Sequence, residues 1–198
     1  RFNLPLSIYD ALTKNTYDIT GLKNVLSATK LIDSPKVALL KERHYNELEE
    51  DISDRIWMLL GSAVHSVLER AEGQNRILEE RMFIDTTTWE LTEKKNMLPE
   101  RTYIAGKPDL YENNMIQDYK VTSVWSVIYG KIEWEYQLNV YAYFFRKLGF
   151  EVTKLQIIAI LKDWAKRDLQ NSKDYPQIPI AVVNIPLWSF GQQEAYIK

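Results

Sequence analysis

Residues 152–161 form a strongly apolar run rich in isoleucine and leucine. Such a run predicts a strand that lies inside a sheet and is buried on both of its faces. A strand of that kind needs helices that cover the sheet. Segments 55–72 and 133–148 supply them, because their apolar residues recur at helical spacing. We therefore expect an α/β fold with a central mixed β-sheet flanked by helices, while an α+β arrangement stays open.

Cap residues predict where the helices begin and end. Ser34 and Pro35 predict a helix start, with Ser34 as the N-cap, and this helix should run through Tyr45. Glycine favours helix ends, so Gly73 should close the helix at 55–72 and Gly149 the helix at 133–148. A short capped turn or helix is expected at 26–32, with Ser27 or Thr29 as the cap.

Further strands are predicted at 81–87, 101–111, 115–122 and 178–187. Asn113 and Asn114 predict a tight turn between the strands at 101–111 and 115–122. Pro179 and Pro186 place the last strand near a sheet edge, because proline cannot donate a ladder hydrogen bond.

The 198 residues are room for one domain, with an N-terminal helical part at 1–54 and a catalytic core at 55–187. The pattern at the end of the chain leaves open a further C-terminal helical element. The chain has no cysteine, which excludes disulfide scaffolds, thiol catalysis and iron–sulfur clusters and fits a reducing, cytoplasmic compartment. No apolar run is long enough to span a membrane. The net charge of −2 points to no particular partner.

The predicted hairpin carries two aspartates. A turn at Asn113-Asn114 places Asp109 opposite Asp118, where two carboxylates need a cation or a shared proton. Lys120 is two residues from Asp118 and shares its face of the strand. The Tyr119 side chain points to the opposite face, but its carbonyl lies between the two and could be a further oxygen ligand for Mg²⁺. The simpler alternative is a surface hairpin with a solvated ion pair between Asp118 and Lys120.

Two helices add polar residues to this picture. Gly61, His65 and Glu69 lie on one ridge of the helix at 55–72, and the glycine would allow close approach of a neighbour. His65 could reach a metal, or it could be a hydrogen-bonded core histidine. Gln137 and Tyr141 lie one turn apart on the helix at 133–148, where Tyr141 could equally be a core residue.

Taken in order, these motifs resemble the RecB-like branch of the PD-(D/E)XK nuclease superfamily. The resemblance covers residues 61–141 and is carried by Gly61, His65, Glu69, Gly106-Lys107-Pro108-Asp109, Asp118-Tyr119-Lys120, Gln137 and Tyr141. It looks most like the short exonucleases carried by bacteriophages. It implies a restriction-endonuclease-like core, and no iron–sulfur cluster because the chain has no cysteine. No phosphate-binding loop of a helicase is present, so any motor would be a separate protein.

The resemblance also implies roles. His65, Asp109, Asp118 and the carbonyl of Tyr119 would bind Mg²⁺ or Mn²⁺. Lys120 would activate the attacking water and stabilise developing charge, and Gln137 would orient Lys120 or the substrate. Tyr141 would contact DNA or brace the site. Glu69 would be an accessory residue.

The implied activity is metal-dependent hydrolysis of DNA, with an exonuclease acting on ends or single strands favoured. An endonuclease or junction-resolving enzyme, a non-cutting DNA-binding module and a metal-dependent hydrolase unrelated to DNA stay open. Lys162, Lys166 and Arg167 are candidate phosphate contacts. Trp125, Trp134 and Trp164 lie near predicted element ends, where a base could stack. A recombination or replication protein is a conceivable partner, and the sequence leaves the oligomeric state open.

Overall fold

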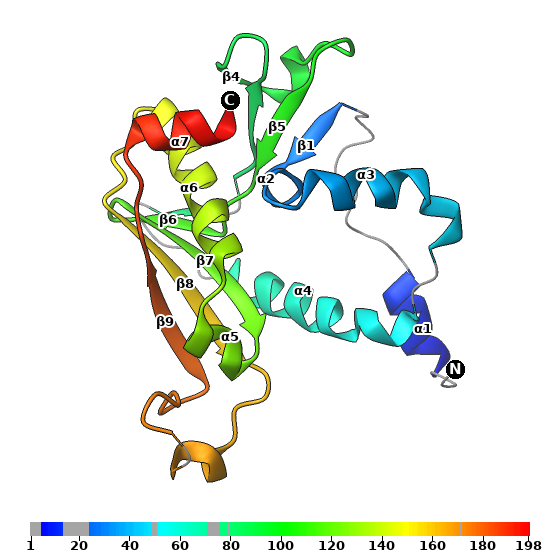
Figure 1. Ribbon diagram of the computed structural model, residues 1–198, viewed down its shortest axis with the longest axis vertical. Coiled ribbons are helices and arrows are strands. Elements are labelled where there is room, and N and C mark those ends of the chain that lie inside the picture. The colour runs from blue at the N-terminus through cyan, green and yellow to red at the C-terminus, as the bar shows by residue number, and fades with distance from the viewer. Residues whose placement is uncertain (1–4, 14–23, 49–50, 71–75, 79, 171) are drawn as a thin grey trace.

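The computed structural model describes residues 5–13, 24–48, 51–70, 76–78, 80–170 and 172–198. It is a mixed α/β fold in which helices flank two sheets, with helices also dominating the N-terminal part (Figure 1). This confirms the expected fold class. None of the helices in these ranges is long and apolar enough to cross a bilayer.

The larger sheet has five strands in the order β2-β6-β7-β8-β9. Its strands are β2 (Arg76–Leu78), β6 (Leu110–Glu112), β7 (Met115–Thr122), β8 (Lys154–Leu161) and β9 (Ile180–Ile185). Strands β7 and β8 are parallel and the other neighbours are antiparallel, so the sheet is mixed. The apolar run predicted to lie inside the sheet does so as β8, and the strand flanked by two prolines is the edge strand β9, as expected.

A second sheet was not expected. It has four strands in the order β1-β5-β3-β4. Its strands are β1 (Val25–Ser27), β3 (Met82–Asp85), β4 (Leu91–Thr92) and β5 (Tyr103–Gly106). Strand β1 pairs in parallel with β5, which ties the N-terminal part to the rest of the chain.

The single strand predicted at 101–111 is wrong. It is divided into β5 and β6, which belong to different sheets. Residues 107–109 are in neither strand. Pro108 has no N–H to donate to a ladder, and it restricts the backbone of the residue before it. The chain therefore leaves one sheet at Gly106 and enters the other at Leu110.

The helices largely follow the predicted caps. They are α1 (Leu6–Thr13), α2 (Ala28–Leu31), α3 (Pro35–Arg43), α4 (Ile56–Leu68), α5 (Val124–Tyr129), α6 (Ile132–Lys147) and α7 (Phe190–Ile197). Ser27 caps α2 by accepting the N–H of Lys30, and Gly149 follows α6 with a φ of 85°. Tyr45 lies beyond the end of α3, in the 3-10 turn η1 (Tyr45–Glu47). Gly73 lies outside the described residues.

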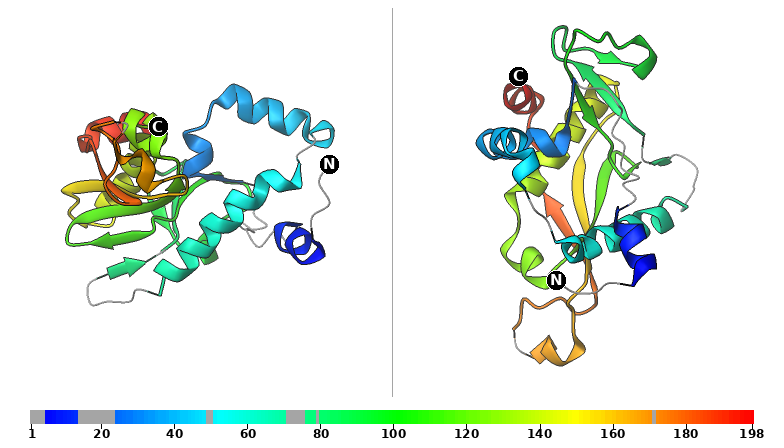
Figure 2. Two further views of the ribbon diagram at one scale, coloured as in Figure 1. Left: turned by 90° about the horizontal axis from the view of Figure 1, so that it is seen from below. Right: turned by 90° about the vertical axis from the view of Figure 1, so that its right-hand side faces the viewer.

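Helix α6 is the centre of the core. Ten of its 16 residues are buried, and it contacts strands of both sheets as well as α2 and α7. Buried residues of both sheets and of α6 belong to one hydrophobic cluster. Helices α3 and α4 extend from the sheets toward one side (Figures 1 and 2). Helix α6 therefore packs against the larger sheet from inside the core, while α4 approaches that sheet from its flank.

Candidate active site

The β6–β7 hairpin has the predicted turn and register. Asn113 and Asn114 have φ values of 52° and 61°, as the tight turn preferred by hairpins requires. The paired positions run from Glu112 with Met115 to Leu110 with Gln117. The ladder ends there. The sequence had suggested that Asp109 and Asp118 are directly opposed, but they are not a paired position of the ladder. Asp109 reaches β7 through its side chain instead.

The Asp109 carboxylate is held from two sides. Its Oδ2 accepts a hydrogen bond of 2.6 Å from the backbone N–H of Tyr119, and its Oδ1 lies 3.2 Å from Nδ1 of His65 on α4. Asp109 is buried and His65 is half-buried. The hydrogen bond to Asp109 and the charge of that carboxylate raise the pKa of His65, although burial opposes the shift. His65 thus orients one aspartate, and its protonated form, which these contacts favour, would compensate the charge of that aspartate.

Asp118 is deeper in the structure, with only 2% of its surface exposed. Its Oδ2 is buried and forms an ion pair with Lys120, whose Nζ lies 2.6 Å away. The angles of this contact are not those of a hydrogen bond, and no other described residue donates one to this oxygen. Burial raises the pKa of Asp118 to about 6; the positive charge of Lys120 opposes this shift and the Asp109 carboxylate adds to it. The two aspartates are therefore near enough to influence each other's ionisation.

Helix α6 supplies the polar residues on the third side. Nε2 of Gln137 lies 3.4 Å from Oδ1 of Asp118 and donates a 2.8 Å hydrogen bond to the hydroxyl of Tyr141. Both residues are buried. Of the two roles expected for Tyr141, burial favours bracing over contact with DNA.

The close approach of α6 depends on a glycine whose role the sequence reasoning missed. A Cβ added to Gly106 would lie 2.7 Å from Cδ2 of Phe144 on α6. Only a residue without a side chain fits there. Gly61 has no such role, because a Cβ built on it meets nothing within 4 Å. The close helix contact expected at Gly61 is wrong.

The structure thus brings together His65, Asp109, Asp118, Tyr119, Lys120, Gln137 and Tyr141 from α4, the hairpin and α6. Glu69, the expected accessory residue, is exposed just past the end of α4. Lys166 and Arg167 lie in the 3-10 turn η4 (Lys166–Gln170), which Figure 1 shows at the tip of the β8–β9 connection, away from α4. These three are not joined to the cluster.

The remaining DNA-contact candidates differ in exposure. Lys162 is exposed, and its Nζ lies 3.9 Å from the ring centroid of Trp57 on α4. Trp134 is buried, so it offers no face for a base. Trp164 is half-buried and its indole N–H donates to the carbonyl of Pro176. Trp125 is 55% exposed, so its ring is open to solvent.

The donor set suits a hard divalent ion. Among the described residues, no three His, Asp or Glu side chains form a group that could hold a metal, and Nδ1 of His65 is already engaged by Asp109. Mg²⁺ does not require three such side chains, because it is usually held by one or two carboxylates and keeps several waters. Asp109 and Asp118 provide two carboxylates, and a bound ion would share the buried Oδ2 of Asp118 with the Lys120 ammonium, which lies 2.6 Å from it.

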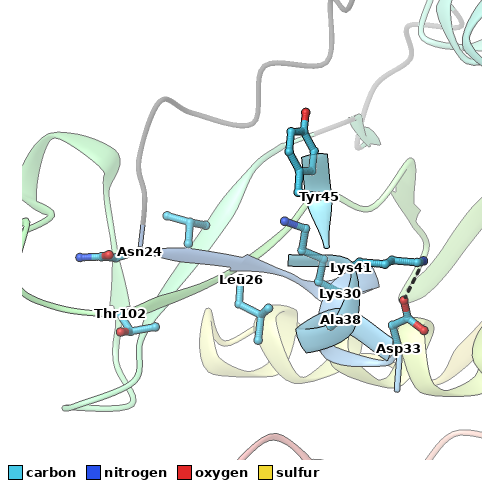
Figure 3. Close-up of a pocket in the computed structure, with 9 residues that line it drawn as sticks. Asn24, Leu26, Lys30, Asp33, Ala38, Lys41, Tyr45 and Thr102 are labelled. Atoms are coloured by element: carbon cyan, nitrogen blue, oxygen red, sulfur yellow. Dashed lines mark ion pairs between the residues drawn. The ribbon is translucent and has the colours of Figure 1, made fainter. Parts of the chain in front are cut away.

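A separate groove of about 750 Å³ lies in the N-terminal part, between β1 and α3 (Figure 3). It is lined by Asn24, Val25, Leu26, Lys30, Asp33, Ala38, Lys41, Tyr45 and Thr102. Nζ of Lys41 lies 3.9 Å from Oδ2 of Asp33 at one end of it (Figure 3). None of the candidate catalytic residues lines this groove.

No model of a protein family matches the chain, and no curated protein matches it. Among solved structures, that of SSO0001 is similar over 98% of this chain and 83% of the other, with a TM-score of 0.58 and 17% identical residues. The two proteins share a fold. An alkaline exonuclease (LHK-Exo) from Laribacter hongkongensis matches over 88% of this chain and 84% of the other, with a TM-score of 0.45 and 10% identity.

Proposed function

We propose that this protein is a divalent-metal-dependent deoxyribonuclease that hydrolyses phosphodiester bonds. One observation carries the proposal: two buried, mutually interacting aspartates lie at the end of one hairpin, with the Lys120 ammonium 2.6 Å from the deeper one. Burying two carboxylates at one place opposes folding, and ionisable groups perturbed in this way cluster at functional sites. The order of the motifs along the chain, which resembles RecB-like nucleases, supports the same assignment.

The proposed metal ligands are Asp109 and Asp118, with the carbonyl of Tyr119 as a third oxygen donor, and His65 orients Asp109. Bound Mg²⁺ or Mn²⁺ would lower the pKa of the attacking water and polarise the phosphoryl oxygen. Lys120 places its positive charge where the phosphoryl group gains negative charge in the transition state. Gln137 fixes Asp118 through its amide, and Tyr141 fixes Gln137 in turn.

An exonuclease acting on DNA ends or single strands is the favoured form of this activity. The decisive assay incubates the protein with end-labelled linear single-stranded DNA, linear duplex and closed circular DNA, each with Mg²⁺, Mn²⁺ or EDTA. We expect metal-dependent loss of the linear substrates alone, and the labelled products would give the polarity. Cutting of the circle would instead indicate an endonuclease, and binding without cutting would indicate a DNA-binding module.

Lys120→Ala and Asp118→Asn should abolish cleavage, since each removes a charge at the proposed reaction centre. Lys154→Ala is the matched control, because Lys154 is an exposed lysine at the opposite, amino-terminal end of β8. Circular dichroism and thermal melts would verify that each variant folds. Full activity of a folded Lys120→Ala or Asp118→Asn protein would overturn the assignment of that residue.

A further inference from the structure

An exposed aromatic pair lies on α5. The rings of Trp125 and Tyr129 stack with centroids 5.8 Å apart and planes 16° from parallel. Trp125 is 55% exposed and Tyr129 is 80% exposed, so most of the pair faces solvent. Two large rings that stack on a short helix and stay exposed to water form a preorganised apolar surface.

Helix α5 follows the strand that carries Asp118 and Lys120. Helix α5 begins two residues after β7 ends, and Figure 1 shows it at the carboxyl end of that strand. Trp125 is five residues from Lys120, so the two α-carbons are at most about 18 Å apart. Val124 at the start of α5 donates its N–H to Oδ1 of Asp163, which holds α5 against the segment after β8.

A second exposed ring and a cation lie at the same edge. Lys162 directly follows β8, and its backbone N–H donates to the carbonyl of Thr122 at the end of β7. Its ammonium lies 3.9 Å from the ring centroid of Trp57, which is 52% exposed. Ligands of α/β sheets bind outside the carboxyl ends of parallel strands, and β7 and β8 are such a pair. We call Trp57, Trp125, Tyr129 and Lys162 the aromatic rim.

We infer that the aromatic rim binds unpaired nucleotides of the strand that enters the active site. Stacking on Trp125 and Tyr129 requires an open base face, which a duplex hides between neighbouring pairs. Lys162 matches the negative backbone that comes with such bases. The inference rests on the proposed function and deepens it: the rim makes single-stranded nucleic acid the preferred substrate.

The test measures binding in EDTA, so that no cleavage occurs. Fluorescence anisotropy would follow a labelled 20-mer of thymidine, an abasic strand of the same length and a 20-base-pair duplex. The variant is Trp125→Ala with Tyr129→Ala, and Tyr45→Ala is the control because Tyr45 is an exposed aromatic in the turn after α3, outside the rim.

The double variant should bind the thymidine strand about 10-fold or more weakly, because each stacked base contributes about 1–3 kcal/mol. Its affinity for the abasic strand and the duplex should change less than 2-fold, since neither offers an open base, and Tyr45→Ala should resemble the wild type. Trp125→Phe, which keeps a ring, should recover part of the lost affinity.

Three outcomes would overturn the inference: wild-type protein that binds abasic and thymidine strands equally, wild-type protein that binds neither strand, or a double variant with unchanged affinity. Failure of the proposed function has a different signature. A wild-type protein that shows the expected base-dependent binding but cuts no DNA in Mg²⁺ or Mn²⁺ would refute the proposed nuclease activity. It would still support nucleotide binding by the aromatic rim.

Discussion

Asp118 is the residue at which folding and the proposed chemistry conflict most directly. Its surroundings exclude water, and burial raises the pKa of its carboxyl to about 6. The ionised form that would bind a metal is thus the form that the metal-free fold disfavours. A bound cation would relieve this conflict, because it replaces the lost hydration of the carboxylate.

This conflict predicts an unusual pH dependence of stability in EDTA. The folded protein holds the Asp118 proton more tightly than the unfolded chain, whose aspartates have a pKa of about 4. The free energy of unfolding should therefore fall as the pH rises from about 4 to about 6, and stay lower above that, by about 3 kcal/mol from this residue. Asp118→Asn should remove this part of the pH dependence, as measured by urea unfolding at several pH values.

Asp174→Asn is the control for the loss of one negative charge, because Asp174 is exposed. It should leave the pH profile of the wild type unchanged. An Asp118→Asn profile that is parallel to the wild-type profile between pH 4 and pH 6 would contradict the predicted ionisation. Adding Mg²⁺ at pH 7 should stabilise the wild type more than Asp118→Asn, because the ion binds only the folded state.

At the scale of elements, two glycines differ sharply in what surrounds them. Gly106→Ala should destabilise the protein by about 1–3 kcal/mol, because its Cβ would overlap the Phe144 ring and force β5 away from α6. Gly61→Ala should stabilise it by up to about 1 kcal/mol, because the new methyl group meets nothing and alanine favours the helix. Thermal or urea unfolding of the two variants measures both effects.

Each variant is a control for the other, because both replace glycine by alanine and differ only in what surrounds the new methyl group. Equal effects would show that the close contact between β5 and α6 does not limit packing. Because Tyr141 also lies near Gly106, the Gly106→Ala protein should lose activity along with stability.

Local patterns predicted the elements whose causes are local. The turn at Asn113-Asn114, the cap at Ser27 and the helix end at Gly149 each depend on a few adjacent residues. The parallel pairing of β1 with β5 joins segments that are nearly 80 residues apart, and no local signal marks it. The break between β5 and β6 had a signal in Pro108, but the apolar pattern on either side outweighed it.

The candidate site was predictable to a similar extent. Its residues were found because their order and spacing resemble a known pattern, and the structure brings seven of them together. Their partners were not predictable: the hydrogen bond from the Tyr119 N–H to Asp109 depends on where the ladder ends. The position of Lys166 and Arg167 depends on the path of a long connection, which spacing alone does not determine.

The hydrophobic periodicity of α4 did not predict how little of this helix is buried. Its apolar spacing predicted the helix correctly, yet none of its residues with a described side chain is buried. Helix α4 contacts the larger sheet at β7, and its other main contacts are with N-terminal elements. An apolar stripe identifies a helix, but the amount of neighbouring structure decides how much of the stripe is covered.

At the scale of the whole molecule, a buried polar network fastens the C-terminal segment to the central helix. Asn139 on α6 accepts hydrogen bonds from the N–H of Trp188 and the amide of Gln193, and donates one to the carbonyl of Pro186. Arg146, also on α6, donates to Oε1 of Gln193. Gln193 is fully buried, so its side-chain amide depends on Asn139 and Arg146 for its hydrogen bonds.

Asn139→Ala should therefore lower the free energy of unfolding by about 2–4 kcal/mol, because it leaves the Trp188 N–H and the Gln193 amide buried without an acceptor. Chemical denaturation would measure this, with Asn96→Ala as the control, since Asn96 is exposed on a surface turn. The hydrogen bonds of Asn139 go to Glu135, Pro186, Trp188 and Gln193, none of which is a candidate catalytic residue. Cleavage per folded molecule should thus persist at 25 °C, and a specific loss of activity without a loss of stability would mean that this network acts on the site itself.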